Sequence, residues 1–248
     1  MSTLRLARFL ARAGVSSRRG AAELVAADRV RINGAPPKGP GDPVDPARDK
    51  VTLDGRSLRL VSLSWLALNK PPGYVTSRRA AERHPSVFDL VKDSQGLVAV
   101  GRLDVMSEGL LLFTTDGDLA SRLMHPKWQV PRRYRVAVTG RLDERGAKAL
   151  EKGVRLDGED RPVRLADWRF LPRGKAGILE LELAEGRSRV VRRLCAALNL
   201  GVRSLTRTAY GPVELGEMTR GTVRKLRPGE RVALYKAAQL DPPPSTLD

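Results

Sequence analysis

The residue best placed to do chemistry is Asp104, in the stretch GRLDVMSEGLLLFTTDGD over residues 101–118. A run of four apolar residues, 110–113, follows it without a polar interruption. Such a run is typical of a strand covered on both faces, so the turn before it must surface at the edge of a core strand. A carboxylate at that edge is held firmly and stays reachable. The alternative is that Asp104 only caps its own turn, as Asp often does.

Histidine and cysteine are scarce, which limits the kinds of catalytic or metal site that the chain could form. The two histidines, His84 and His125, both precede proline, and the single cysteine, Cys195, lies among apolar residues that favour a buried thiol. These residues do not suit a Ser/His/Asp or Cys/His catalytic set, a zinc site or a disulfide framework. No phosphate-binding loop motif follows a predicted strand. Catalysis would rest on carboxylate, Arg, Lys and Tyr groups without a metal. We interpret His125 as a structural or backbone-bonding residue. Lys70 could reach a phosphate, but we interpret it as a solvated lysine.

Tyr134 is a second candidate, in the alternating segment RYRVAV over residues 133–138. Alternation predicts a strand in which Tyr134 points the same way as Val136 and Val138. An inward tyrosine could be a core residue with a satisfied hydroxyl, or a platform on which an unstacked base lies. The alternation leaves both interpretations open.

Arginines gather where a predicted strand passes into a helix. The segment ILELEL, residues 178–183, alternates as a half-buried strand does, and apolar residues recur at helical spacing from Val191 onward. Arg187 and Arg189 are expected at the end of the strand, and Arg192 in the first turn of the helix, where a cation opposes the helix dipole. An anion facing these side chains would explain their position; ordinary surface charge is the alternative.

The composition is that of a basic globular protein. The 248 residues include 45 Lys and Arg against 28 Asp and Glu, a formal net charge of +17 with a pI near 10.9. The expected partner is a polyanion, with nucleic acid ahead of a membrane surface. No apolar run approaches the roughly 18 residues that span a bilayer, and the N-terminus lacks a signal-peptide core. We therefore expect a soluble, cytoplasmic protein with no membrane partner.

The first 60 residues predict a small RNA-binding module. Apolar residues at helical spacing over 4–13 indicate a short basic helix, and a Ser-Ser pair can cap a second one. The segment VRING, residues 30–34, predicts a strand entering a tight turn, and Asp54-Gly55 predicts another. This order resembles the RNA-binding domain shared by a small-subunit ribosomal protein and tyrosyl-tRNA synthetases. Asp28 stands where that domain usually has glycine, and Asp tolerates the left-handed conformation.

That resemblance implies that the two helices grip RNA phosphates. The arginines that would do so are Arg5, Arg12, Arg18 and Arg19. A solvated basic face is the alternative for each of them.

Four motifs resemble, in order and spacing, those of the bacterial ribosomal-RNA pseudouridine synthases of type A (small ribosomal subunit) and type B (large ribosomal subunit). They are GRLDVMSEGLLLFTTDG, RYRV, EGRSRVVRR and LTRTAYG. The match covers residues 65–236, and the RNA-binding module in front belongs to the same architecture. The resemblance implies that Asp104 is the catalytic aspartate, Tyr134 the active-site tyrosine and Arg192 the arginine that pairs with the aspartate. Ser107 stands where threonine is common.

The implied reaction needs no cofactor. The bond from N1 to C1′ of a uridine breaks, the uracil turns, and C5 bonds to C1′. An ionised carboxylate could attack C1′ or C6, or take the C2′ proton, and the sequence leaves these routes open. Arg192 would hold Asp104 ionised and aimed, and the resemblance makes Tyr134 the candidate base for the C5 proton. Folded RNA hides its bases, so the uridine should be flipped into the pocket. Further RNA contacts are expected from Arg102, Arg187, Arg189 and Arg207.

The predicted fold class is α+β with two domains and a tail. A helical-plus-hairpin RNA-binding domain spans residues 1–60, and a mostly antiparallel central-sheet synthase domain with flanking helices spans 65–238. Within the second domain, residues 154–167 are expected to form a strand pair. Residues 239–248 read as a flexible tail.

We expect a monomer that acts on ribosomal RNA, with the large-subunit RNA favoured over the small-subunit RNA. The rival is a non-catalytic RNA-binding or ribosome-assembly factor on the same fold, which would explain the charge and the first domain equally well. It gives no reason for Asp104, Tyr134 and Arg192 to stand at matching motif positions.

Overall fold

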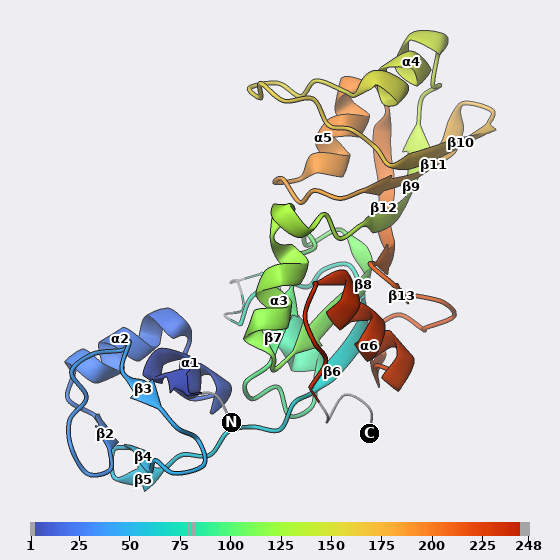
Figure 1. The fold of residues 1–248 in the computed structure, drawn as a ribbon. Helices are drawn as coiled ribbons and strands as arrows, with labels where there is room; N and C mark the ends of the chain where they lie inside the picture. Colours follow the sequence, from blue (N-terminus) through green and yellow to red (C-terminus); the bar gives the residue numbers. More distant parts are fainter. Residues whose placement is uncertain (1–2, 79, 81–82, 244–248) are drawn as a thin grey trace. The chain divides into compact units, whose positions relative to one another are not determined.

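The chain forms two compact units, each described here by itself (Figure 1). The computed structural model describes residues 3–78, 80 and 83–243, apart from the side chain of Arg18. The smaller unit runs to residue 64 and includes the short segments 93–98 and 114–117. The larger unit contains residues 65–92, 99–113 and 118–248.

Two short helices, α1 (Leu6–Arg12) and α2 (Arg18–Ala26), build the smaller unit. The Ser17 hydroxyl caps α2 by accepting a hydrogen bond from the Gly20 N–H at 3.0 Å, as the Ser-Ser pair predicted. The core of this unit is formed by Leu6, Phe9, Leu10, Ala13, Ala21, Val30, Val44 and Val51. These residues come from both helices and from the strands below, so neither helix buries its apolar face alone.

Five short strands complete the smaller unit. They are β1 (Leu4–Arg5), paired with β3 (Pro43–Val44), and the sheet of β2 (Val30–Ile32), β4 (Val51–Leu53) and β5 (Arg56–Ser57). The turns at Asn33-Gly34 and Asp54-Gly55 have positive φ at both residues, as the two predicted turns require, and Asp28 is also left-handed. The first helix begins two residues later than expected, so Arg5 lies on β1 and not on the helix.

The larger unit is organised around a nine-stranded sheet. Its order is β10-β11-β9-β12-β8-β6-β14, with β13 paired to β12 and β7 to β8. The strands are β6 (Trp65–Lys70), β7 (Val98–Val100), β8 (Glu108–Thr114), β9 (Arg132–Thr139), β10 (Asp167–Arg173), β11 (Ala176–Leu183), β12 (Gly201–Tyr210), β13 (Val213–Glu214) and β14 (Val223–Lys225). The β12–β8 pair is parallel, whereas β9 is antiparallel to both β11 and β12. The predicted α+β class with a mostly antiparallel sheet is confirmed.

Helices flank this sheet (Figure 1). They are η1 (Val87–Leu90), α3 (Gly117–Met124), η2 (Pro126–Trp128), α4 (Glu144–Lys152), α5 (Val190–Ala197) and α6 (Pro228–Ala237). α5 packs against β12 and buries Val190, Val191, Leu194 and Cys195, at the helical spacing that the sequence shows. In the described part of the chain no helix is both long and apolar enough to cross a membrane.

Two predicted elements differ from the structure. The strand pair over 154–167 is reduced to one bridge between Val154 and Val163, because turn-forming residues and Pro162 interrupt the ladder. The strand before α5 ends at Leu183, and Arg189 takes a left-handed conformation as the N-cap residue of the helix. The arginines expected at a strand end therefore lie on a loop.

Part of the predicted tail is attached to the larger unit. The Arg122 guanidinium donates to the Gln239 carbonyl at 2.6 Å, and the Leu240 N–H donates to the Tyr235 carbonyl at 2.9 Å. Residues 244–248 of the predicted tail, and residues 79, 81 and 82 of the basic segment before His84, lie outside the described residues.

The contact between β8 and β12 gives a stability prediction at Gly109. This glycine has φ of 100° and pairs with Arg207, and a Cβ there would lie 2.4 Å from the Arg207 carbonyl oxygen. We expect Gly109→Ala to lower the free energy of unfolding by about 3 kcal/mol, from strain plus overpacking. Gly216→Ala is the control, with φ of 54° and no neighbour within 4 Å. Urea unfolding should show that Gly216→Ala lowers the free energy of unfolding by about 1 kcal/mol. Equal losses of stability for the two variants would contradict the packing argument.

Candidate active site

The Asp104 loop, residues 101–107, links β7 to the buried strand β8. Every residue of β8 is buried, so the predicted fully covered strand is confirmed. The loop turns tightly, because the Ser107 N–H donates to the Asp104 carbonyl at 2.9 Å. The Asp104 side chain remains 39% exposed. Among the described residues, no backbone N–H is bonded to its carboxylate, which therefore holds an outward position and does not cap the turn.

Lys70, the last residue of β6, lies beneath this loop. Its side chain is fully buried. Its ammonium group donates to the carbonyls of Pro71, Asp104, Val105 and Ser107 at 3.0, 3.2, 3.1 and 2.7 Å. Burial lowers the pKa of Lys70 to about 8, and the charges of Asp104 and Glu108 oppose that shift. The expectation of a solvated lysine is wrong, and Lys70 is a residue of this site that the sequence analysis missed.

Arg192, in the first turn of α5, reaches the same loop from the other side. Its Nε lies 3.6 Å from Oδ2 of Asp104. Its Nη2 donates to Ser107 Oγ at 3.2 Å and approaches the Met106 carbonyl at 3.4 Å. The Ser107 hydroxyl thus accepts from the guanidinium. Two residues 88 positions apart in the chain form one ion pair.

A pocket of about 440 Å³, here called the Asp104 pocket, opens at this ion pair. Tyr134 lines it from β9, with 9% of its surface exposed and on the same strand face as the buried Val136 and Val138. Its predicted orientation is confirmed. Tyr134 and Arg207 are paired residues on neighbouring strands β9 and β12, so both enter the pocket from the sheet.

Arg207 is enclosed and not at the surface, which excludes the surface-charge alternative for this residue. It is 2% exposed. Its Nε donates to the Leu110 carbonyl at 2.7 Å, and its guanidinium lies 5.1 Å from the Tyr210 ring centroid. Within the described residues, its buried Nη2 has no hydrogen-bond partner. An unsatisfied donor beside a pocket suits a polar ligand.

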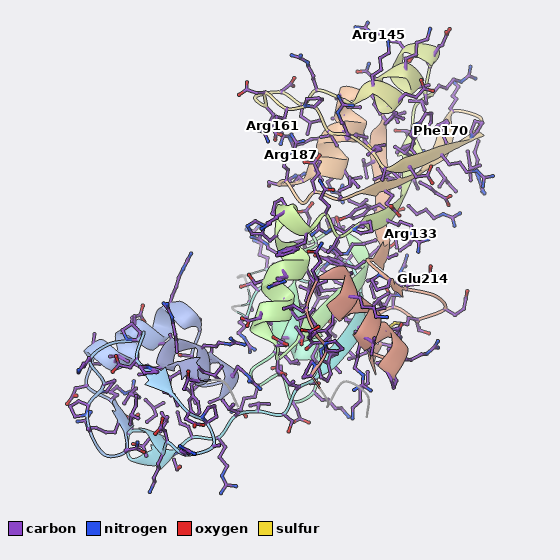
Figure 2. All side chains as sticks on the ribbon, viewed as in Figure 1. Arg133, Arg145, Arg161, Phe170, Arg187 and Glu214 are labelled. Atoms are coloured by element: carbon purple, nitrogen blue, oxygen red, sulfur yellow. The ribbon has the colours of Figure 1, made fainter. Side chains whose placement is uncertain are left out.

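Arg187 is engaged by the protein itself. It forms ion pairs with Glu185 and Glu159. It also donates to the Arg161 carbonyl at 2.8 Å, and both arginines are labelled in Figure 2. Glu159 also pairs with Arg193. These contacts raise the pKa of Arg187 and lower that of Glu159, because each charge is stabilised by its partners. The network ties the segment around residue 159 to the start of α5, and the sequence analysis did not anticipate it.

The remaining arginines expected to bind RNA fall into two groups. Arg102 and Arg189 line the Asp104 pocket, as Arg187 and Arg207 do. The structure therefore brings these four together with Asp104, Tyr134 and Arg192. Arg5 and Arg19 are exposed and Arg12 half-buried in the smaller unit, while the Arg18 side chain lies outside the description. Their contacts with RNA stay predictions.

The histidine and cysteine residues take no part in the pocket. Nδ1 of His125 accepts from the Lys127 N–H at 3.1 Å, so it is a backbone-bonding residue as expected. Cys195 is buried, and burial raises the pKa of its thiol to about 12. The described residues contain no group of three or more His, Cys, Asp and Glu that could hold a metal ion.

Known proteins share this fold. A crystal structure of a pseudouridylate synthase aligns over 93% of this chain and 99% of its own, with a TM-score of 0.66 and 28% identity. The family model of RNA pseudouridylate synthases matches residues 64–197, and the S4 domain model matches residues 4–57. The chain belongs to the RNA pseudouridine synthase family and carries an S4 domain. It is an RNA pseudouridine synthase, and both resemblances seen in the sequence are confirmed.

Relatives extend over nearly the whole chain. An uncharacterized RNA pseudouridine synthase of Aquifex aeolicus is 37% identical over 97% of both chains. One of Mycobacterium tuberculosis H37Rv is 40% identical over 96% of this chain and 95% of its own. The ribosomal large subunit pseudouridine synthase B of Pseudomonas aeruginosa is 39% identical over 96% of this chain and 63% of its own.

The buried ammonium group predicts a pH dependence of stability. The pKa of Lys70 is lower in the folded chain than its ordinary value of 10.5, so unfolding takes up a proton between about pH 8 and 10.5. In that window Lys70 makes the free energy of unfolding rise with pH. From pH 7 to 10.5 we expect the free energy of unfolding of wild type to rise, relative to that of Lys70→Met, by up to about 3 kcal/mol.

Urea unfolding of both proteins at several pH values measures this difference. Carbon-13 NMR of lysine Cε in the wild type follows the same titration without a variant. A Lys70 resonance that titrates near its ordinary value, with parallel pH curves for the two proteins, would contradict the lowered pKa.

The Glu159 network gives a second prediction. Glu159→Gln keeps the shape of the side chain and removes the charge that Arg187 and Arg193 share. We expect a lower thermal unfolding midpoint and a several-fold lower rate of pseudouridine formation, because the start of α5 carries Arg192. Since the pKa of Glu159 is lowered, the stability difference should shrink as the pH falls below the ordinary value of 4.5.

Glu144→Gln is the matched control, because its ion pair with Lys148 is exposed on α4. Tritium release from uridine-labelled RNA measures the rate, and a thermal scan measures stability. A Glu159 variant that behaves as the Glu144 variant does would show that the network does not position α5.

Proposed function

We propose that this synthase isomerises specific uridines of ribosomal RNA, with Asp104 as the reacting carboxylate. The observation that carries the proposal is the exposed carboxylate of Asp104, 3.6 Å from the Arg192 guanidinium at the mouth of a pocket lined by Tyr134. The pair fixes the direction of the carboxylate, and the pocket offers space for one flipped nucleotide.

The reaction rearranges bonds within one nucleotide. The glycosidic bond from N1 to C1′ breaks, the uracil turns in the pocket, C5 bonds to C1′, and the C5 proton moves to solvent while N1 gains one. Atoms and electrons balance without a cofactor. Asp104 could attack C1′ or C6, or take the C2′ proton. All three routes need a carboxylate that is held still and open to the substrate, which the Asp104 loop provides.

Tyr134 is the proposed base for the C5 proton and a stacking surface for the uracil. It lies in the same pocket as Asp104, and the neighbouring strand position is occupied by the Arg207 guanidinium. An aromatic ring at a pocket wall stacks on any pyrimidine. A tyrosine accepts a proton as the phenolate, a form that a nearby cation stabilises.

The RNA partner is proposed from charge and from relatives. The chain has a net charge of +17 and an S4 domain, and arginines surround the pocket. Such charge supports binding to a phosphate backbone. The similarity to a ribosomal large subunit pseudouridine synthase B over 96% of this chain favours the large-subunit RNA as the substrate. We further propose that the protein works as a monomer in the cytoplasm, through Arg5, Arg12, Arg18 and Arg19 of the S4 domain and Arg102, Arg187, Arg189 and Arg207 at the pocket.

Pseudouridine mapping tests the activity, the substrate and the carboxylate together. Both ribosomal RNAs would be mapped by carbodiimide-stop sequencing in cells lacking this protein and in cells rescued with wild type or variants. We expect loss of one or a few large-subunit sites on deletion, recovery with wild type, and none with Asp104→Asn, because the amide can neither attack nor accept a proton.

Asp93→Asn is the control, since it makes the same change at an exposed acid that does not line the pocket. Sites lost in the small-subunit RNA would reassign the substrate. Recovery with Asp104→Asn would remove Asp104 from the chemistry, and an unchanged map would favour a non-catalytic RNA-binding or ribosome-assembly factor.

A further inference from the structure

A second space, here called the outer hollow, adjoins the Asp104 pocket. Its volume is about 510 Å³, within the range of small-ligand sites. Its walls are residues 126 and 129 at η2, residues 161, 162 and 164, and residues 184, 185 and 187. Arg187 lines both the outer hollow and the Asp104 pocket. The two spaces therefore meet at one side chain, and the reaction itself uses only the inner one.

The outer hollow has a net positive charge. Three arginines, Arg161, Arg164 and Arg187, and one glutamate, Glu185, line it. Arg187 and Glu185 form an ion pair, so their charges offset each other. Arg161 and Arg164 are exposed, and within the described residues neither side chain forms an ion pair or a hydrogen bond. A wall of this composition attracts an anion.

The backbone that carries Arg161 is held from inside the protein. Arg187 donates to the Arg161 carbonyl at 2.8 Å, and Arg193 donates to the Asp157 carbonyl at 2.8 Å. Glu159, which lies between these two carbonyls in the sequence, pairs with both donors. The loop is thus fixed through its carbonyls and one carboxylate, while the Arg161 side chain stays exposed.

Arg164 lies at the base of the same loop. Its neighbour Val163 exchanges two backbone hydrogen bonds with Val154, at 2.9 and 2.8 Å, and these close the loop. Glu159 therefore engages two arginines that hold the loop, and the two arginines on the loop keep their charges for a ligand. A held backbone places exposed charges more precisely than a loose loop does.

We propose that the outer hollow binds phosphates of the RNA strand next to the target uridine, through Arg161 and Arg164. This inference rests on the proposed function. A uridine turned into the Asp104 pocket stays joined to its neighbours by phosphodiester bonds, so the strand must leave the pocket along one of its walls. The wall at Arg187 leads to the outer hollow, whose net positive charge suits that backbone. Guanidinium groups bind phosphate oxygens through paired N–H donors, whatever the base.

A kinetic separation of binding from chemistry tests the proposal. A stem-loop around the uridine identified by mapping would carry tritium at C5, and single-turnover tritium release would be followed over a range of enzyme concentrations. The half-saturating concentration reports binding, and the maximal rate reports the chemistry. The test variant is Arg161→Ala with Arg164→Ala. The control is Arg145→Ala with Arg173→Ala, which removes the same charge from exposed arginines that line neither space (Figure 2 labels Arg145 and Arg161).

We expect the half-saturating concentration of the test variant to rise about tenfold, because two charged hydrogen-bond donors are lost. Its maximal rate should equal that of wild type, since neither arginine touches the reacting atoms. The slope of log affinity against log salt should become less steep by about 1.4, the value for two phosphate contacts on a single strand. The control variant should stay close to wild type in all three quantities.

Neutral linkages locate the contact on the RNA. Single phosphates on either side of the target would be replaced by methylphosphonates, each beside a 2′-O-methyl ribose that protects the linkage. One or two of these replacements should weaken binding by wild type and by the control variant. The same replacements should add nothing to the loss already present in the test variant.

The outcomes separate the outer hollow from the function on which it rests. Inactive wild type on the stem-loop would overturn the proposed function. Active wild type, with a test variant that matches the control in affinity and salt dependence, would overturn the phosphate site alone, as would methylphosphonate effects that are equal in the two variants. A lower maximal rate together with a lower thermal midpoint would assign Arg161 and Arg164 to the structure of the loop.

Discussion

A buried ammonium group is stable only when its hydrogen bonds are satisfied, and Lys70 meets this requirement with four carbonyl oxygens. Three of the four belong to the Asp104 loop. The carbonyls of Asp104, Val105 and Ser107 all turn inward to Lys70, and these bonds hold the backbone of the loop in place. On this loop the Asp104 side chain is 39% exposed, and Met106, taken as a whole residue, is 65% exposed.

Two further cations, from other elements, bind the end of this loop and the start of β8. Arg192 approaches from α5 and bonds to Ser107, and Arg207 approaches from β12 and bonds to the carbonyl of Leu110. Lys70 comes from β6. Three elements, β6, α5 and β12, thus each supply one cation to this short stretch, from which all three are distant in sequence. Hydrogen bonds to charged donors are stronger than neutral ones, so this stretch is held more firmly than an ordinary surface loop. A catalytic carboxylate needs that rigidity more than it needs burial.

The sequence predicted what depends on neighbouring residues. The apolar run after Asp104 predicted the buried strand, alternation predicted the face of Tyr134, and helical spacing predicted α5 with Arg192 in its first turn. The burial of Lys70 and Arg207 could not be predicted, because the carbonyls that accept their hydrogen bonds are distant in sequence. These carbonyls lie close to them only in the folded sheet. For Lys70, the available sequence signal was its position at the end of an apolar strand, just before two prolines. The Glu159 network was also hidden, since its arginines lie 28 and 34 residues further on.

The two faces of the sheet differ in how their charge is compensated. On the face opposite Tyr134, Arg133 pairs with Glu214, both labelled in Figure 2. Arg133 also pairs with Glu182, and Arg135 pairs with Glu180. On the pocket side, Arg102 and Arg189 have no carboxylate partner among the residues that the structure describes. Arg133 and Arg135 are thus compensated by carboxylates, whereas two of the arginines beside Asp104, Arg102 and Arg189, are not. Since a polyanion is drawn to uncompensated cations, this distribution would lead the RNA to the face where the carboxylate is exposed.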